Sequence, residues 1–208
     1  KLLQDLSLLN EWPERVRTMQ ENWIGRSTGV KIRFPLVGSS TVVDCFTTRV
    51  DTIFGATYAA IAPEHPVIAE LLLNNPRKAE IETFINKVRN ESRIERTRED
   101  IEKNGIDSGR KVVNLITGEE IPLWIVDYVL MDYGTGAVMA VPTHDTRDFA
   151  FAKKYNLPMK VVIKDPENSE EKALQEAYTG EGKLIHSGEF DGIPNTEAKD
   201  KIGEYMEK

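Results

Sequence analysis

Short β-rich runs recur along this chain, and helical patterns interrupt them at irregular intervals. Three runs follow one another near the start, separated by prolines or glycines: VKIRF (30–34), TVVDCFTTR (41–49) and TYAAIAP (57–63). Residues 111–142 are β-rich again, and Thr117-Gly118 predicts the turn of a hairpin within them. Irregular alternation favours an α+β fold over a regular βαβ array, and we expect a β-barrel-like core with short helices around it.

The helical patterns are short and lie at both ends of the chain as well as between the β-rich runs. The first range, 1–26, is expected to hold two helices, with Pro13 in the first turn of the second. The other expected helical ranges are 75–98, 145–155, 169–177 and the residues from Asn195 onward. A further strand is expected over 159–163, and we expect Phe149 and Ala152 to face inward. The sequence thus predicts a linker segment, 1–26, followed by one domain, 27–208.

Charge and cysteine content exclude several classes of function. A net charge of −7 argues against a protein whose main task is to grip nucleic-acid phosphates, although it permits contact with an RNA end held by another domain. The single cysteine, Cys45, excludes a disulfide framework and a four-cysteine zinc site. No apolar stretch approaches the ~20 residues of a membrane span. Lys1 begins a chain without a signal-peptide pattern, and we expect an excised piece of a larger protein.

The hexapeptide TTRVDT (47–52) is dense in hydroxyl groups and charges. Thr47 and Thr48 are expected at a strand end, where hydroxyls can orient a water or contact a ribose. Thr52 offers a branched side chain with no freedom beyond χ1, which suits a rigid pocket wall. A purely structural role is the alternative, because threonines favour strands and Asp51 can simply pair with Arg49.

The segment GTGAVMAVPTHDTRD (134–148) joins a glycine-loosened apolar strand to the start of a helix. Its glycines permit close approach of a ligand, and its aliphatic run can form an apolar pocket floor. Asp145 and Asp148 fall in the first helical turn, where one carboxylate suffices as a cap. The other can bind a cation such as an α-ammonium group. We expect Asp148 to be exposed, so that its loss costs at most ~1 kcal/mol of stability.

His144 beside Asp145 also permits a divalent-metal phosphohydrolase as an alternative. Such a site needs further histidines nearby, and the other two, His65 and His186, are distant in the sequence. We therefore expect neither a metal nor a cofactor. Together, the two chemistry-bearing segments suit a small substrate that carries an amine, and they lack a Ser/His or Cys/His nucleophile pair.

Both segments, with NWIGRS (22–27) and SGEFDGIPN (187–195), resemble the editing insertion of bacterial-type leucyl-tRNA synthetases. This insertion is the connective polypeptide 1 (CP1) domain that class I synthetases for leucine, isoleucine and valine share, and GTGAVMAVPTHDTRD is specific to the leucyl branch. The likeness runs from about Asn22 to Met206. Val50 stands where the family has proline, but every hydroxyl and charge of the motif is present. The ATP-binding signatures HIGH and KMSKS are absent, so the resemblance implies no aminoacylation by this chain.

The resemblance implies post-transfer editing, which is hydrolysis of the ester that joins a wrong amino acid to tRNA-Leu. Isoleucine, norvaline and methionine-type side chains are the implied substrates, leucine is excluded sterically, and water attacks directly. The implied catalytic residues are Thr47, Thr48 and Asp148, of which Asp148 holds the substrate α-ammonium group. The implied substrate-binding residues are Thr52, which blocks leucine, Tyr133, Met139, Val141, Asp145, and Arg49 with Asp51, which brace the loop.

The implied partners are the 3' aminoacyl end of tRNA-Leu and the remainder of the synthetase. Segment 1–26 would link the domain to the aminoacylation part. No membrane is involved, and the implied location is the cytoplasm. The chief alternative is a non-catalytic module of the same shape, which docks the tRNA acceptor end but hydrolyses nothing in isolation.

Overall fold

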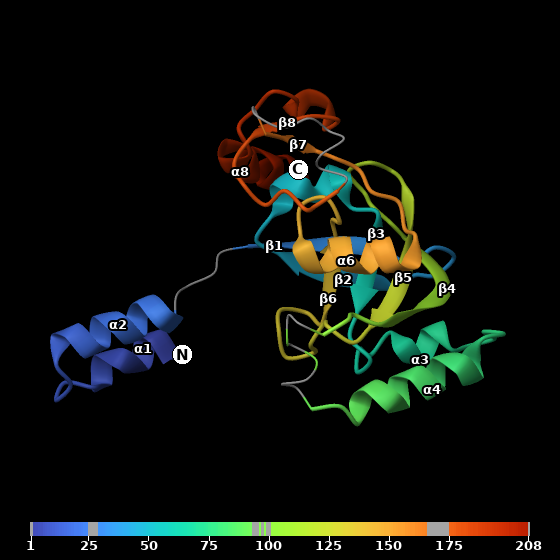
Figure 1. The fold of residues 1–208 in the computed structure, drawn as a ribbon, viewed down its shortest axis with the longest axis horizontal. Coiled ribbons are helices and arrows are strands. Elements are labelled where there is room, and N and C mark those ends of the chain that lie inside the picture. The colour runs from blue at the N-terminus through green and yellow to red at the C-terminus, as the bar shows by residue number, and fades with distance from the viewer. Residues whose placement is uncertain are drawn as a thin grey trace.

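The β-rich runs form three sheets in the computed structural model, which describes residues 2–24, 29–92, 96, 98, 101–165 and 175–207 (Figure 1). The largest sheet has the strand order β4-β5-β3-β6. Its strands are β3 (Tyr58–Ile61), β4 (Gly105–Val113), β5 (Glu120–Val126) and β6 (Ala137–Ala140). β3 pairs parallel with β5, and the other two pairings are antiparallel. The expected hairpin is present, because β4 and β5 are antiparallel neighbours around Gly118.

Two smaller antiparallel sheets complete the β structure. β1 (Val30–Pro35) pairs with β2 (Val42–Thr47), and β7 (Ile163–Lys164) pairs with β8 (Lys183–Leu184). An isolated bridge between Leu36 and Val112 ties the first of these to the large sheet, and β2 packs against β6. The α+β class is therefore confirmed. Among the described residues, the strands wrap around a shared core as three sheets and close no hydrogen-bonded ring.

The central strand β3 is buried on both faces, and the alternation of its side chains divides the core in two. Ala59 and Ile61 of β3 face a large aliphatic cluster with the inward residues of β1 and β2. Tyr58 and Ala60 face the opposite way, into a second cluster beneath α6 (Thr146–Tyr155). This aromatic cluster consists of Tyr58, Trp124, Tyr128, Phe151 and Tyr155. It fixes the helix whose first turn carries the site.

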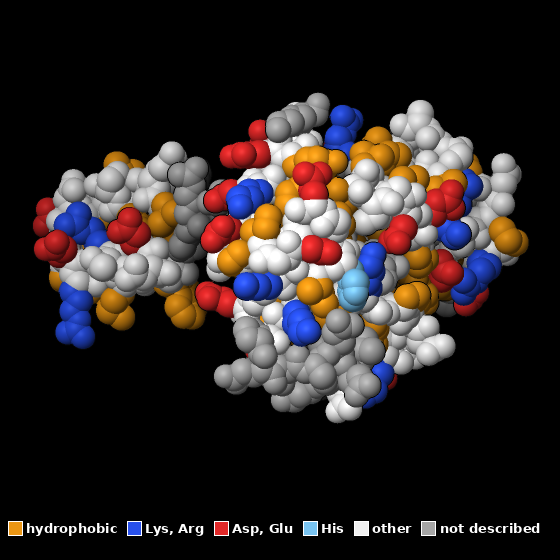
Figure 2. Space-filling model, turned by 90° about the horizontal axis from the view of Figure 1, so that it is seen from above, with side chains coloured by type: hydrophobic (Ala, Val, Ile, Leu, Met, Phe, Trp, Pro, Cys, Tyr) orange, Lys and Arg blue, Asp and Glu red, His pale blue; other side chains and the backbone are white. Residues whose placement is uncertain are grey.

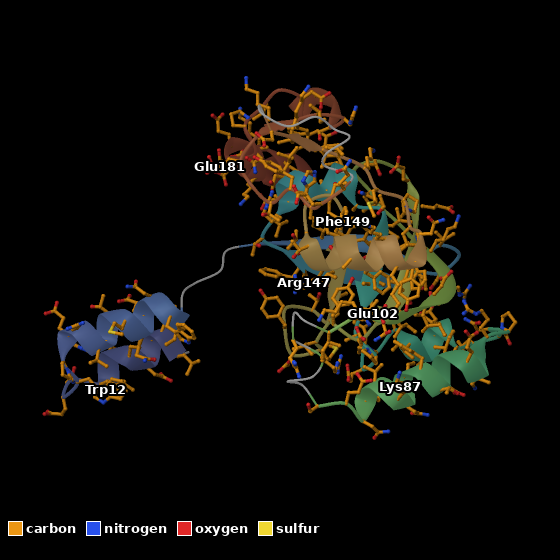
Figure 3. The ribbon with its side chains drawn as sticks, viewed as in Figure 1. Trp12, Lys87, Glu102, Arg147, Phe149 and Glu181 are labelled. Atoms are coloured by element: carbon orange, nitrogen blue, oxygen red, sulfur yellow. The ribbon has the colours of Figure 1, made fainter. Side chains whose placement is uncertain are left out.

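The remaining helices surround this core. They are α1 (Leu2–Asp5), η1 (Leu6–Leu8), α2 (Glu14–Ile24), η2 (Val50–Gly55), α3 (Ile68–Leu71), α4 (Lys78–Arg89), η3 (Gly188–Phe190) and α8 (Asn195–Met206). α1 and α2 pair as a hairpin in which no described residue is buried, and its apolar side chains lie at the surface among charged ones (Figure 2). Figure 3 shows Trp12 on this hairpin, and Arg147 and Phe149 on α6. Among the described residues, no helix is long and apolar enough to span a membrane.

Some expected elements differ in extent. The strand expected over 159–163 is reduced to the two-residue β7. On α6, Phe151 fills the core beside Ala152, whereas Phe149, which was expected to face inward, is only half-buried. The inward face of α6 is set by the rings that surround Phe151, which the helical period alone did not reveal. The helix expected over 75–98 begins and ends within that range as α4. Most of the helix expected over 169–177 lies outside the described residues, as do positions 25–27 of NWIGRS.

Candidate functional site

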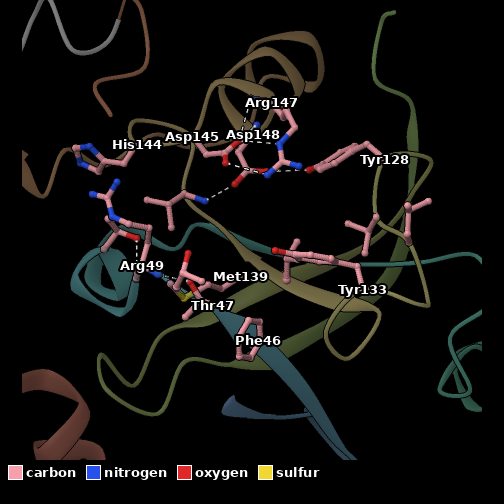
Figure 4. A pocket seen from close by; sticks show the side chains of 16 residues that line it. Phe46, Thr47, Arg49, Tyr128, Tyr133, Met139, His144, Asp145, Arg147 and Asp148 are labelled. Carbon is pink, nitrogen blue, oxygen red and sulfur yellow. Dashed lines mark hydrogen bonds and ion pairs between the residues drawn. The ribbon is translucent and has the colours of Figure 1, made fainter. Parts of the chain in front are cut away.

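A cavity of about 350 Å³ lies between the end of β2, the η2 turn, β6 and the start of α6. The fold thus brings TTRVDT and GTGAVMAVPTHDTRD together around one space, as the sequence predicted. The expected site residues that line it are Thr47, Thr48, Arg49, Thr52, Tyr133, Met139, Val141, Asp145 and Asp148. Figure 4 shows the two carboxylates on one side of the cavity, with Thr47, Met139 and Phe46 across from them.

The backbone of Arg49 orders the hydroxyl wall. The Thr47 Oγ1 accepts a hydrogen bond from the Arg49 backbone N–H at 2.9 Å, and the Thr52 Oγ1 donates to the Arg49 carbonyl at 2.8 Å. Thr52 is buried, whereas Thr48 is exposed at the rim. Because the Thr47 hydroxyl accepts from the backbone, its proton remains available to a ligand or a water. The wall is therefore rigid and still offers a donor.

Asp51 lies behind this wall, and it does not line the cavity. Its carboxylate is fully buried and pairs with the Arg49 guanidinium, at 2.9 Å from Nη2 and 3.1 Å from Nε. The Asn195 side chain donates to it from the far side at 3.4 Å. A buried carboxylate held by a bidentate guanidinium is a structural feature. Asp51 therefore reaches the cavity only through Arg49.

Asp148 is buried, contrary to the expectation of an exposed first-turn carboxylate. Its Oδ2 accepts from the Val141 backbone N–H at 2.9 Å, and its Oδ1 accepts from the Tyr128 hydroxyl at 3.1 Å. The aromatic cluster covers this side of α6, which a helical-turn argument does not reveal. Burial, and next the negative charge of Asp145, raise the pKa of Asp148 to about 7. A carboxyl in this state binds protons near neutrality and gains strongly from a cation.

Asp145 is the helix cap. Its side chain accepts from the backbone N–H groups of Arg147 at 2.9 Å and Asp148 at 3.2 Å, and it pairs with the Arg147 guanidinium at 3.2 Å. The sequence left open whether Asp145 caps the helix or contacts the substrate. The structure shows the cap, at a position that also borders the cavity. Asp148 is consequently the carboxylate that is not needed for capping.

His144 is committed to the fold. Its Nε2 accepts from the backbone N–H groups of Val162 at 3.0 Å and Ile163 at 3.1 Å, so its Nδ1 carries the proton and donates to the Tyr178 carbonyl at 2.9 Å. Burial lowers the pKa of His144 to about 4. In the part of the chain that the structure describes, no three His, Cys, Asp or Glu residues form a metal-binding group. The geometry gives no support to the phosphohydrolase alternative.

The sequence interpretation missed several residues that line the cavity, namely Phe46, Tyr128, Val129, Leu130, Val138 and Arg147. Tyr128 is the most consequential of them, because it hydrogen-bonds Asp148. A signal was available: Tyr128 follows the apolar strand EIPLWIV closely, and a buried tyrosine hydroxyl needs a partner. The sequence did not show which group this partner is, and the structure identifies it as the Asp148 carboxylate.

The raised pKa of Asp148 predicts a pH effect on stability. The folded pKa of about 7 lies above the ordinary value of 3.8, so the folded state binds more protons between these values, and stability falls as pH rises through them. Between pH 5.5 and 8 the wild type should lose about 2 kcal/mol of unfolding free energy relative to Asp148→Asn. Urea unfolding of both proteins at the two pH values measures this. Equal pH dependence in the two proteins would contradict the raised pKa.

Comparisons with known proteins bear on the whole chain. The family model described as "Leucyl-tRNA synthetase, editing domain" matches residues 21–207. Leucine–tRNA ligases of Citrifermentans bemidjiense and Thermotoga petrophila are 52% and 48% identical over all of this chain, which spans 25% of each. A solved chain from the ternary LeuRS-tRNA-LeuAMS complex of Agrobacterium radiobacter K84 agnB2 has a TM-score of 0.66 and 38% identity, over 83% of this chain and 21% of that one.

Proposed function

This chain belongs to the editing-domain family of leucyl-tRNA synthetases, and we propose that it hydrolyses the ester bond of mischarged aminoacyl-tRNA-Leu. The observation that carries this proposal is the cavity itself, in which a buried carboxylate faces a wall of threonines. Asp148 suits the α-ammonium group of an esterified amino acid. The threonines suit the ribose and the attacking water, and Met139 with Val141 suits an apolar side chain.

A separate hydrolytic site is needed because a binding pocket alone discriminates poorly between similar amino acids. An apolar pocket separates side chains that differ by one methylene by only ~10–200-fold, whereas accurate translation needs on the order of 10⁴. Norvaline and isoleucine are close enough to leucine to pass the charging site. A second site that hydrolyses wrong esters and excludes leucine supplies the missing factor. In this proposal, the buried and rotationally fixed Thr52 is the element that excludes leucine.

The chemistry proposed is direct attack of water on the ester carbonyl, which releases the amino acid and the tRNA ribose hydroxyl. No serine or cysteine is among the residues that line the cavity. Cys45 is buried, and burial raises the pKa of its thiol. His144 uses both ring nitrogens within the fold. Proximity and oriented hydrogen bonds therefore provide the acceleration, which an already activated ester permits.

We also propose that the α1–α2 hairpin belongs to the linker that joins the domain to the aminoacylation part. The family model begins at residue 21, whereas the full ligases align over the whole chain. None of the described residues of α1 and α2 is buried. The remainder of the synthetase and the tRNA acceptor end are the proposed partners.

The test is deacylation of Ile-tRNA-Leu and Leu-tRNA-Leu by this chain, measured side by side at high protein concentration. We expect loss of isoleucine to be ~10–200-fold faster than loss of leucine, because one misplaced methyl group costs roughly 1–3 kcal/mol. Addition of a chelator should change neither rate. If neither ester is cleaved, while the chain within an intact ligase cleaves Ile-tRNA-Leu, the isolated chain is only a docking module.

A further inference from the structure

We propose that the hydroxyls of Tyr58 and Tyr128 are the positioning groups of the site, and that they hold the Asp148 carboxylate in the orientation that receives the substrate ammonium group. This inference rests on the proposed function. The two tyrosines come from different parts of the large sheet, since Tyr58 begins β3 and Tyr128 follows β5. Neither belongs to TTRVDT or to GTGAVMAVPTHDTRD.

The hydroxyls form a directed chain that ends on the carboxylate. The Tyr128 hydroxyl lies 3.1 Å from the Asp148 Oδ1 and donates to it. Its single proton is thereby used. The Tyr58 hydroxyl lies 3.0 Å from the Tyr128 hydroxyl and 3.4 Å from the Asp148 backbone carbonyl, so it donates its own proton to the nearer acceptor, Tyr128. Successive donors in a buried chain polarise one another and strengthen the last bond. The Asp148 carboxylate therefore receives a stronger donor than a single tyrosine would supply.

The orientation of the carboxylate is fixed from two sides. Tyr128 binds Oδ1, and the Val141 backbone N–H of the strand-to-helix connection binds Oδ2 at 2.9 Å. Each carboxylate oxygen can accept two hydrogen bonds, so each retains one acceptor position. Figure 4 shows both bonds on Asp148, which borders the open cavity. The remaining positions are the ones available to an ammonium group.

The aromatic cluster keeps the tyrosines in place. The Phe151 ring stacks on Tyr58 at 5.4 Å between centroids and contacts Tyr128 at 5.6 Å. Phe151 lies three residues after Asp148, so both project from the same face of α6. α6 thus carries the Asp148 carboxylate, and one turn later it carries the Phe151 ring, which holds Tyr58 and Tyr128 in place.

The charges around Asp148 explain why these donors are needed. Asp145 disfavours its ionised form, Arg147 favours it, and β6 contributes no charged side chain. Both tyrosines stay protonated, because burial and then the Asp148 charge raise the pKa of each well above 10. The Tyr128 bond lowers the pKa of Asp148 and so opposes its burial. Loss of this bond should raise that pKa further.

Tyr128→Phe, tested in the chain and within an intact ligase, is the decisive variant. At pH 7 we expect kcat/KM for Ile-tRNA-Leu to fall about tenfold, the usual loss for a hydrogen bond to a charged group. The acidic limb of the pH–rate profile should shift to higher pH. The loss of kcat/KM should be smaller at pH 9, where Asp148 is ionised in both proteins. Tyr58→Phe should change both quantities in the same direction by a smaller factor, since it acts through Tyr128.

Tyr155→Phe is the matched control. Tyr155 belongs to the same aromatic cluster, with its ring 4.5 Å from Phe151, but its hydroxyl accepts from the Gly105 N–H and not from the Asp148 region. It should cost stability and leave both kcat/KM and the pH profile within about twofold of wild type. Equal effects of Tyr128→Phe and Tyr155→Phe would mean that Tyr128 has only a packing role.

A carbon-13 titration of the Asp148 carboxyl in the chain provides a readout independent of catalysis. We expect its midpoint to rise in Tyr128→Phe and to stay unchanged in Tyr155→Phe. An unchanged midpoint in Tyr128→Phe overturns the inference even if hydrolysis is normal in the wild type. If the wild type hydrolyses no ester in either context, the proposed function fails, and the titration alone decides whether the tyrosines control Asp148.

Discussion

Asp148→Asn is expected to reduce kcat/KM for deacylation of Ile-tRNA-Leu by about 10²–10³-fold at pH 8. At that pH the wild-type carboxyl, with a pKa of about 7, is ionised and can pair with the substrate ammonium group. Removal of one partner of a buried charged pair costs roughly 2–5 kcal/mol, and each 1.4 kcal/mol is a factor of ten. Initial rates over a range of substrate concentrations measure the loss.

Asparagine is chosen because it keeps the shape of the side chain and a partner at both contacts, although the contact with Tyr128 reverses its hydrogen-bond direction. Its Oδ1 can accept from the Val141 N–H, and its Nδ2 can donate to the Tyr128 hydroxyl oxygen in place of Oδ1. Alanine at this buried position would leave both groups unpaired, so inactivity of that variant would be ambiguous. The asparagine variant therefore tests the loss of the negative charge without leaving buried groups unpaired as alanine would.

Asp127→Asn serves as the control for loss of a buried carboxylate. Asp127 is also buried and accepts from the Asn104 backbone and side chain, but it does not line the cavity. It should lower stability and leave deacylation within a few-fold of wild type. A wild-type rate in folded Asp148→Asn would show that Asp148 does not hold the ammonium group.

Local patterns in the sequence predicted the elements that bear the site. The TTRVDT hydroxyls lie where β2 ends, and Asp145 caps α6 through its first turn. Both features depend on neighbours within a few residues, which is the range over which strand ends and caps are determined. The α+β class followed from the same local signals. The residue types of the two segments also indicated one shared pocket, and the resemblance to leucyl-tRNA synthetases added the roles of the individual residues.

The burial of Asp148 could not be obtained in this way. It depends on Tyr128, which is distant in the sequence, and on rings from β3, β5 and α6 that meet only in the folded chain. Helical periodicity placed Ala152 correctly on the inward face, but it favoured Phe149 over Phe151, because both positions border that face. Long-range packing decided between them. The same packing raises the pKa of Asp148, so its electrostatics were equally hidden from the sequence.

Thr52→Ala is expected to make the site hydrolyse correctly charged Leu-tRNA-Leu at a rate about 10–100-fold above the wild type. Thr52 is buried in the cavity wall, and its hydroxyl is bonded to the Arg49 carbonyl at 2.8 Å, so the side chain cannot rotate away from a bound ligand. Alanine removes the branch and leaves space for the branched end of leucine. One methylene-sized change in an apolar pocket is worth roughly 1–3 kcal/mol, which gives this range.

Thr52→Val separates shape from hydrogen bonding in that result. Valine keeps the branched volume but loses the bond to the Arg49 carbonyl, at a cost of about 1 kcal/mol in stability. If exclusion is steric, Thr52→Val should still spare Leu-tRNA-Leu, and only Thr52→Ala should cleave it. Both variants are assayed within an intact leucine–tRNA ligase, with Ile-tRNA-Leu as the positive control. Cleavage of Leu-tRNA-Leu by both would assign the exclusion to the hydroxyl-held turn, and sparing by both would remove Thr52 from the specificity of the site.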